Sequence, residues 1–181
     1  MNDIPQKEKD LRKIKRIFTL VWSGCLFIII LPLISFIVSI YLNSYLNLPN
    51  VVFYPLNIII GLLFLLIGFF WAGWSNIELY KTGKGTAVPL KHTQTTILVL
   101  KGPYKYTRNP MVFGYILIWV GLGFFFNSYV ILIGFSSIVL VFLIIFIKSW
   151  EEKDLERRFG QSYLDYKKRV SMIIPLPPRK Y

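Results

Sequence analysis

The sequence predicts an all-α polytopic membrane protein with about four transmembrane helices, both termini cytoplasmic, and an amphipathic helical tail at the C-terminal end. Hydrophobic residues make up 55% of the 181-residue chain, and the mean hydropathy is +0.55. Both values are higher than those of an ordinary soluble domain. Several uncharged apolar runs are also as long as a helix that crosses a bilayer, so we expect a membrane lipid bilayer around the helices.

The 21 Lys and Arg residues give a net charge of +12 and fall into three groups separated by apolar runs. Six lie in residues 1–16, six in residues 81–108 and nine from Lys148 onward, whereas the connections 43–52 and 126–129 carry no charge. Basic residues gather on the cytoplasmic side of membrane helices. The distribution therefore predicts cytoplasmic termini and a cytoplasmic middle segment, and it accounts for the basic composition without a nucleic-acid partner.

Two membrane helices are expected in an N-terminal unit, residues 1–80. The first, residues 17–42, contains Pro32, whose missing N–H leaves a helix carbonyl for a neighbouring helix to satisfy. No small-residue cleavage pattern follows it, so we expect this helix to be retained. The second, residues 52–74, contains three glycines of the kind that let helices pack closely in lipid: Gly61, Gly68 and Gly73.

The C-terminal unit, residues 81–181, is expected to hold a polar loop, a membrane hairpin and short tail helices. The apolar run 111–147 is too long for one helix and divides at Asn127-Ser128 into two spans of about 16 to 19 residues. After this hairpin, the chain returns to the side from which it entered. The charged segments before and after the hairpin are therefore predicted to form one site at the cytoplasmic interface.

The tail after Trp150 has the pattern of two short amphipathic helices. Leu155 and Phe159 fall four positions apart on one helix face, and Gly160 suits the position just past a helix end. Ser162 and Asp165 have the spacing of a capping box that opens a second helix.

The segment 102–114, Gly-Pro-Tyr-Lys-Tyr-Thr-Arg-Asn-Pro-Met-Val-Phe-Gly, holds the first group of candidate site residues. The guanidinium of Arg108 suits a carboxylate or a phosphate, and the N-terminus of the following helix also favours an anion. Glu151 and Glu152 supply carboxylates after the hairpin, about 100° apart on a helix, so that one faces the site and the other faces elsewhere. These groups suit a zwitterionic, nucleoside-bearing molecule that meets a lipid-embedded one.

A metal site is not expected from the sequence. Cys25 is the single cysteine and His92 the single histidine, so that neither a thiolate cluster nor a histidine set can be built.

The segment 102–114, the hairpin and the following Glu-Glu-Lys-Asp-Leu-Glu-Arg-Arg-Phe-Gly closely resemble the isoprenylcysteine carboxyl methyltransferase and phospholipid methyltransferase superfamily. The upstream run 83–89, Gly-Lys-Gly-Thr-Ala-Val-Pro, resembles the Gly-Thr-x-x-Pro loop of that family. The resemblance covers about residues 80–175. One departure is Val112, at a position where the family often has an aromatic residue.

The resemblance implies S-adenosylmethionine as cofactor and a lipophilic methyl acceptor. Arg108 and Glu152 would be the catalytic, positioning groups, because methyl transfer from a sulfonium to a thiolate, carboxylate or amine requires alignment more than acid–base chemistry. The cofactor-binding residues implied by the resemblance are Gly85, Tyr104, Tyr106, Arg108, Asn109, Pro110, Gly114, Glu151 and Glu152.

The sequence motifs leave the methyl acceptor open. Carboxyl methylation of the isoprenylcysteine type is favoured, with phospholipid amine N-methylation and small-thiol S-methylation as alternatives. An NADPH-dependent membrane sterol reductase and a non-enzymatic membrane scaffold are the alternatives of another class.

Overall fold

A computed structural model describes residues 24–83 and 94–178, together with the single positions 11, 14, 18, 21 and 22. The described chain is helical, with one isolated bridge between Thr107 and Ser171 and no strand among these residues. In chain order the elements are η1 (Cys25–Ile30), α2 (Leu31–Tyr45), α3 (Leu56–Lys81), η2 (Gly102–Lys105), α4 (Pro110–Phe125), η3 (Val130–Phe135), α5 (Ser136–Phe146), η4 (Ile147–Glu151), α6 (Glu152–Phe159) and α7 (Gln161–Arg169).

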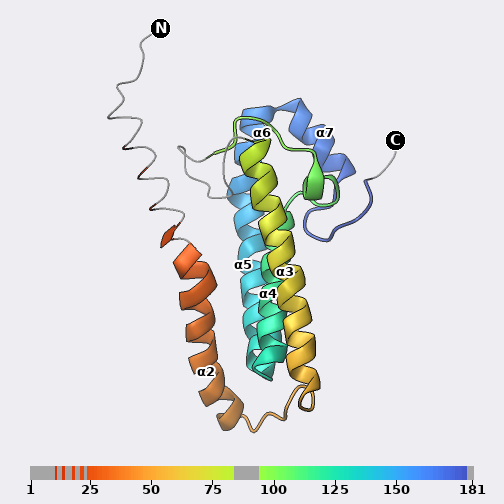
Figure 1. Cartoon of the computed structure of the whole chain (residues 1–181). Helices are drawn as coiled ribbons and strands as arrows, with labels where there is room; N and C mark the ends of the chain where they lie inside the picture. Colours follow the sequence, from red (N-terminus) through yellow and green to blue (C-terminus); the bar gives the residue numbers. More distant parts are fainter. Residues whose placement is uncertain are drawn as a thin grey trace.

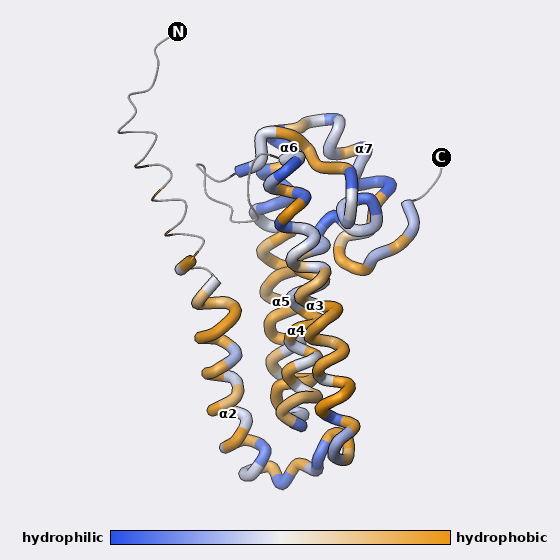
Figure 2. The backbone as a smooth tube through the Cα atoms, in the orientation of Figure 1, coloured by the Kyte–Doolittle hydropathy of each residue, from blue (hydrophilic) through white to orange (hydrophobic). Residues whose placement is uncertain are grey.

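The long helices α3, α4 and α5 lie side by side, α2 stands beside them, and α6 and α7 gather at one end (Figure 1). Three helices are long and apolar enough to cross a membrane, namely Cys25–Tyr45, Leu56–Lys81 and Val130–Phe159. The remaining expected span is α4, which is apolar but has 16 residues, slightly below the usual length. Figure 2 shows apolar residues along these helices and hydrophilic residues around α6 and α7. The predicted all-helical membrane fold is confirmed.

Glycines bring the backbones of α3 and α4 into direct contact. A Cβ added at Gly68 would stand 2.7 Å from the carbonyl oxygen of Gly114, and one added at Gly61 would stand 2.7 Å from the backbone nitrogen of Phe125. No side chain larger than hydrogen fits either position without a shift of backbone. The predicted packing role is therefore confirmed for Gly61 and Gly68, whereas Gly73 has open space around it.

The first membrane helix is tied to the bundle near Pro32. Its segment η1 is π-helical, a form in which each N–H bonds to the carbonyl five residues earlier. Pro32 has no N–H to offer Phe27, and the hydroxyl of Tyr115 on α4 donates to that carbonyl at 2.8 Å. A neighbouring helix thus satisfies the carbonyl that the proline frees, as expected from the sequence.

The hairpin between α4 and the last membrane helix turns at residues 126–129, where the sequence predicts it. Asn127 adopts a positive φ of 54°, a conformation that asparagine tolerates better than most residues. Its side-chain amide accepts from the backbone nitrogen of Val52 and donates to the Val52 carbonyl, at 3.1 and 3.0 Å. The Asn43 side chain donates to Ser128 at 2.8 Å. The two uncharged connections are therefore hydrogen-bonded to each other.

The last membrane helix does not stop at the charged tail, because Val130–Phe159 runs as one helix of 30 residues. Gly160, at φ +54°, ends it, and α7 follows at once. The capping box predicted at Ser162 and Asp165 is wrong: Gly160 is the N-cap and makes no side-chain cap bond. Asp165 instead accepts hydrogen bonds from Gln161 and Lys168 on the exposed face of α7.

The division of the chain at residue 80 stays a prediction.

Candidate functional site

Arg108, Glu152 and Lys167 form a charged cluster at the end of the bundle where α6 and α7 lie. The Nη1 of Arg108 donates to Oε1 of Glu152, and Nζ of Lys167 lies 2.6 Å from Oε2 of the same carboxylate. The side chains of Arg108 and Glu152 are only 9% and 8% exposed. A carboxylate this buried needs charged or hydrogen-bonding partners, and it has one on each oxygen. The hairpin thus brings together the two residues that the sequence names as central.

The position of Glu152 on its helix depends on η4, the π-helical segment that ends at Glu151. A π-turn holds an extra residue, so it rotates the side chains that follow relative to a continuous α-helix. Glu152 points inward to Arg108, and Glu151 is half-buried and takes no part in the ion pairs of this cluster. The expectation that only one of the two carboxylates faces the site agrees with this arrangement.

Tyrosines of α7 close the inner side of the cluster. The Nη1 of Arg108 lies 3.3 Å from the hydroxyl of Tyr163, and burial, with a smaller contribution from the charge of Glu152, raises the pKa of Tyr163 to about 12. The Tyr163 hydroxyl is therefore neutral at physiological pH and accepts from Arg108. Tyr166 donates to the carbonyl of Tyr104 at 2.6 Å, which connects α7 to the segment that precedes Arg108.

The C-terminal segment, residues 171–176, is hydrogen-bonded to the backbone at and before Arg108 and to the side chain of Asn109. The nitrogen of Arg108 donates to the carbonyl of Ser171 at 2.9 Å, and the nitrogen of Leu176 donates to the carbonyl of Tyr106 at 2.9 Å. The side-chain amide of Asn109 donates to the carbonyl of Met172 at 2.9 Å. Arg108 is therefore held from two directions, by the start of α4 after it and by residues 171–176 beside it.

The opposite face of α6 holds the end of the polar loop. Arg158 donates to the carbonyl of Thr95 at 2.7 Å and to the carboxylate of Asp154 at 2.8 Å. The side chain of Gln94 also donates to Asp154, at 3.1 Å. Glu152 and Asp154 are two positions apart, so they face nearly opposite sides of the helix. One face of α6 thus serves the charged cluster and the other positions residues 94–95.

The other predicted site residues have varied surroundings. Tyr104 and Asn109 are each 8% exposed, Pro110 is fully buried at the start of α4, and Tyr106 is 38% exposed. Gly114 packs against Gly68 on α3, so that helix packing accounts for its missing side chain. Gly85 lies outside the described residues. The cofactor role of each of these residues stays a prediction.

The aromatic residue next to Val112 does not take over its position. The ring of Phe113 packs edge-on against Trp71 of α3, with the ring centroids 5.2 Å apart. One residue is about 100° of helix rotation, so Phe113 faces the helix interface while Val112 points elsewhere. The departure of this sequence from the family pattern therefore remains at position 112.

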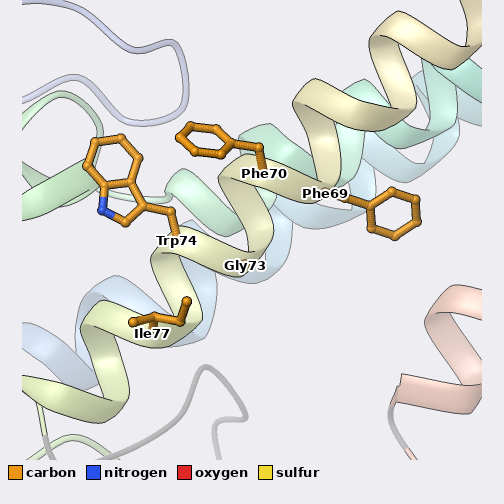
Figure 3. Close-up of a pocket in the computed structure, with 5 residues that line it drawn as sticks. All are labelled: Phe69, Phe70, Gly73, Trp74 and Ile77. Atoms are coloured by element: carbon orange, nitrogen blue, oxygen red, sulfur yellow. The ribbon is translucent and has the colours of Figure 1, made fainter.

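A shallow apolar hollow of about 390 Å³ lies on the surface of α3 rather than at the charged cluster. Figure 3 shows its lining on one helix, and this lining consists of Phe69, Phe70, Gly73, Trp74 and Ile77. None of the predicted site residues lines it. Within residues 24–83 and 94–178, no group of three or more His, Cys, Asp or Glu side chains is placed to hold a metal ion.

Sequence reasoning did not identify Tyr163, Lys167 or Met172 as neighbours of the site. Tyr163 and Lys167 belong to a helix that follows a sharp turn at Gly160, and the face of that helix that meets Arg108 depends on the turn. Met172 contributes only a backbone carbonyl, for which side-chain identity gives no signal. The basic run at the end of α7 is the one pattern that could have suggested a cation beside Glu152.

These features are those of a membrane protein with a charged site at one end of a helical hairpin. A family model described as phospholipid methyltransferase matches residues 56–162, which is more than half of the chain. The chain belongs to the phospholipid methyltransferase family, and the resemblance seen in the sequence motifs is confirmed.

Two relatives carry more specific names. The chain is 27% identical over 128 residues to methanethiol S-methyltransferase 2 of Bradyrhizobium diazoefficiens, a match that covers 61% of this chain and 46% of the relative. It is 25% identical over 127 residues to methanethiol S-methyltransferase of Mycobacterium tuberculosis, covering 61% and 48%. The chain thus spans about half the length of the curated relatives it matches.

Proposed function

We propose that this protein is an integral membrane methyltransferase that uses S-adenosylmethionine and methylates a small apolar thiol. The observation that carries the proposal is the Arg108–Glu152 pair, nearly buried at the end of the hairpin, in a chain of the phospholipid methyltransferase family. The names of the two relatives support a thiol as acceptor. They favour it over isoprenylcysteine-type carboxyl methylation, to which the sequence motifs alone gave preference.

The residues present fit the proposed cofactor. The Nε of Arg108 is buried and finds no hydrogen-bond partner among the described residues. A buried donor without a partner is costly, and an arginine fork suits a carboxylate, such as that of an amino acid group. Arg108 would hold this carboxylate, and Glu152 would hold an ammonium or ribose hydroxyls. Tyr104 and Asn109, which flank Arg108 in the sequence, would complete the binding surface.

The work of the chain in this reaction is alignment. When bound, S-adenosylmethionine would supply a methyl group on a sulfonium, and its carbon–sulfur bond would break as the bond to the acceptor sulfur forms. The thiolate is the nucleophile, and the proton of the thiol leaves to water beforehand. Arg108 and Glu152 would fix the donor, and the apolar helices would exclude water from the approach of the acceptor. No side chain has to act as a general base.

The site is proposed to face the cytoplasm. Lys167 belongs to the basic C-terminal group, in the same segment as Glu152, and Arg108 belongs to the basic middle group. The connections at the other end of the helices are uncharged. The positive-inside rule places the basic end on the cytoplasmic side. The donor would then reach the site from the cytoplasm and an apolar acceptor from the bilayer.

Ligand binding by the detergent-solubilised full chain tests the donor. We expect binding of S-adenosylmethionine and of its demethylated product, and weaker binding after Arg108→Ala or Glu152→Ala. Lys153→Ala is the matched control, because Lys153 is exposed and adjacent to Glu152. Tight binding of NADPH, with no binding of S-adenosylmethionine or of its demethylated product, would instead indicate the sterol reductase class.

Labelled donor identifies the acceptor. The protein is incubated with methyl-labelled S-adenosylmethionine and either methanethiol or membrane extract. Label in a volatile sulfide would support thiol methylation. Methanol released by base would indicate a methyl ester, and base-stable label in lipid would indicate N-methylation, so either of these would overturn the choice of acceptor while keeping the methyltransferase class.

A further inference from the structure

Lys167 is shared between two carboxylates of the preceding helix. Its Nζ lies 2.6 Å from Oε2 of Glu152 and 2.8 Å from Oε1 of Glu156. The side chain of Glu152 is 8% exposed, whereas those of Lys167 and Glu156 are about one third exposed. Lys167 is thus the cation on the solvent side of a carboxylate whose other oxygen belongs to the proposed donor site.

The path of the chain makes this contact possible. Glu152 and Glu156 lie one turn apart on α6 and so share a face. Gly160, at φ +54°, turns the chain back, and a conformation of this kind favours glycine. Tyr163, Tyr166 and Val170 then pack as a buried cluster with Leu98, Leu155 and Phe159. This apolar cluster fixes α7 against α6, and it places Lys167 within ion-pair distance of both glutamates.

We propose that Lys167 is a positioning residue, which orients the Glu152 carboxylate so that Oε1 faces Arg108 and the methyl donor. This inference rests on the proposed function, because it assigns a purpose to Glu152. With Lys167 present, each oxygen of the carboxylate has its own cation and the group is fixed in rotation. Without Lys167, Oε2 loses its partner although the carboxylate is mostly buried. The carboxylate is then free to turn toward solvent or to accept hydrogen bonds from Arg108 with both of its oxygens.

The adjacent lysine provides a matched control. Lys168 has the same side chain on the same helix, but it is 61% exposed and pairs only weakly, at 3.4 Å, with Asp165. Surface pairs of this kind contribute little. A loss of positive charge from α7 as such would therefore appear in both lysine variants, whereas an effect through Glu152 would appear only at Lys167.

The first test measures the affinity of the detergent-solubilised full chain for S-adenosylhomocysteine. We expect Lys167→Met to weaken binding roughly tenfold, the size typical of losing one hydrogen-bonded charge partner. Lys167→Arg should restore most of the affinity, because it keeps the charge and the donors, and Lys168→Met should leave the affinity unchanged. Equal losses in Lys167→Met and Lys168→Met would overturn the proposal.

A double-mutant cycle with Glu152→Gln separates positioning from a general structural role. If Lys167 acts through Glu152, Lys167→Met should weaken binding little further in the Glu152→Gln background. Additive losses, or a loss that Lys167→Arg does not restore and that accompanies a lower unfolding temperature, would assign Lys167 a structural role and overturn the proposal.

The wild-type measurement separates a failure of the proposed function from a failure of the proposed role of Lys167. Absence of S-adenosylhomocysteine binding in the folded wild-type protein would overturn the proposed function, and the role of Lys167 with it. Binding in the wild type with the same affinity in Lys167→Met would overturn only the role of Lys167.

Discussion

The α3–α4 interface and the Arg108–Glu152 cluster are both buried, but they are built in opposite ways. In the interface, backbones touch where glycines leave no side chain, as at Gly68 and Gly114. In the cluster, long side chains from the loop before α4, from α6 and from α7 reach across to one another. The first arrangement depends on volume, whereas the second depends on charge and hydrogen-bond geometry.

The two regions therefore tolerate different kinds of substitution. An added methyl group is costly in the interface, where the neighbouring atoms are backbone and cannot move aside. A change of charge or of donor geometry is costly in the cluster, where Glu152 and Arg108 are mostly desolvated. Substitutions in the interface should lower stability, and conservative substitutions in the cluster should lower ligand binding while the helices persist.

The largest effect is expected for Gly68→Val. Its side chain would overlap the carbonyl oxygen of Gly114 and separate α3 from α4, at a cost of about 3 kcal/mol in the free energy of unfolding. Thermal unfolding in detergent measures this loss. Gly73→Val, on the same helix with open space around it, is the control, and equal destabilisation by both variants would contradict the contrast between packed and open glycines.

A smaller effect, on binding rather than stability, is expected for Arg108→Lys. The variant keeps the positive charge beside Glu152 but loses the planar fork and the Nε donor. We expect S-adenosylhomocysteine binding to weaken by about 2 kcal/mol, roughly thirtyfold. Calorimetric titration measures the affinity and circular dichroism the helix content; wild-type affinity in the variant would show that the fork does not contact the donor.

The hydrogen bonds that join the C-terminal segment to the backbone around Arg108 should contribute less to stability. Asn109→Ala removes the hydrogen bond to the Met172 carbonyl and is expected to cost about 1 kcal/mol of stability. Proteolysis of the C-terminal segment, followed by mass spectrometry, should become faster in this variant. If cleavage is unchanged while donor binding falls, Asn109 contacts the ligand rather than holding the tail.

The smallest effect is expected for Tyr115→Phe. It removes the hydroxyl that donates to the Phe27 carbonyl freed by Pro32, a bond worth about 0.6 kcal/mol between membrane helices. Comparing the unfolding temperature of Tyr115→Phe with that of Pro32→Ala/Tyr115→Phe gives the check. The double variant should recover stability, because an alanine at position 32 offers an N–H to that carbonyl.

The membrane architecture was predictable because its signals are local. Uncharged runs indicated the spans, Asn127-Ser128 indicated the hairpin turn, and Gly61 and Gly68 indicated a close helix interface; the structure agrees with each. The meeting of Arg108 with Glu152 followed from the hairpin itself, since two antiparallel membrane helices return the chain to the side from which it entered. Such conclusions need periodicity and charge but no side-chain detail.

The inner arrangement of the site was not predictable in the same way. Which of Glu151 and Glu152 faces Arg108 depends on the π-helical segment η4, for which a single sequence offers no clear signal. Ser162 and Asp165 matched a capping box, but Gly160 with its positive φ begins α7 before either can cap it. Lys167 reaches Glu152 only because of that turn. Rotations of about 100° per residue decide these contacts.

The unequal lengths of the two hairpin helices have a mechanical consequence. From their common turn, α4 rises 16 residues, about 24 Å, and Val130–Phe159 rises 30 residues, about 45 Å. The shorter helix falls below the roughly 30 Å of a typical hydrocarbon core, a mismatch that a bilayer relieves by thinning or by altering helix tilt. The Arg108–Glu152 pair joins the residue two positions before α4 to a residue seven positions before the end of the longer helix. A change in membrane thickness that alters the tilt of α4 relative to the longer helix would therefore act on the Arg108–Glu152 pair, which lies at the opposite end of the hairpin from the turn.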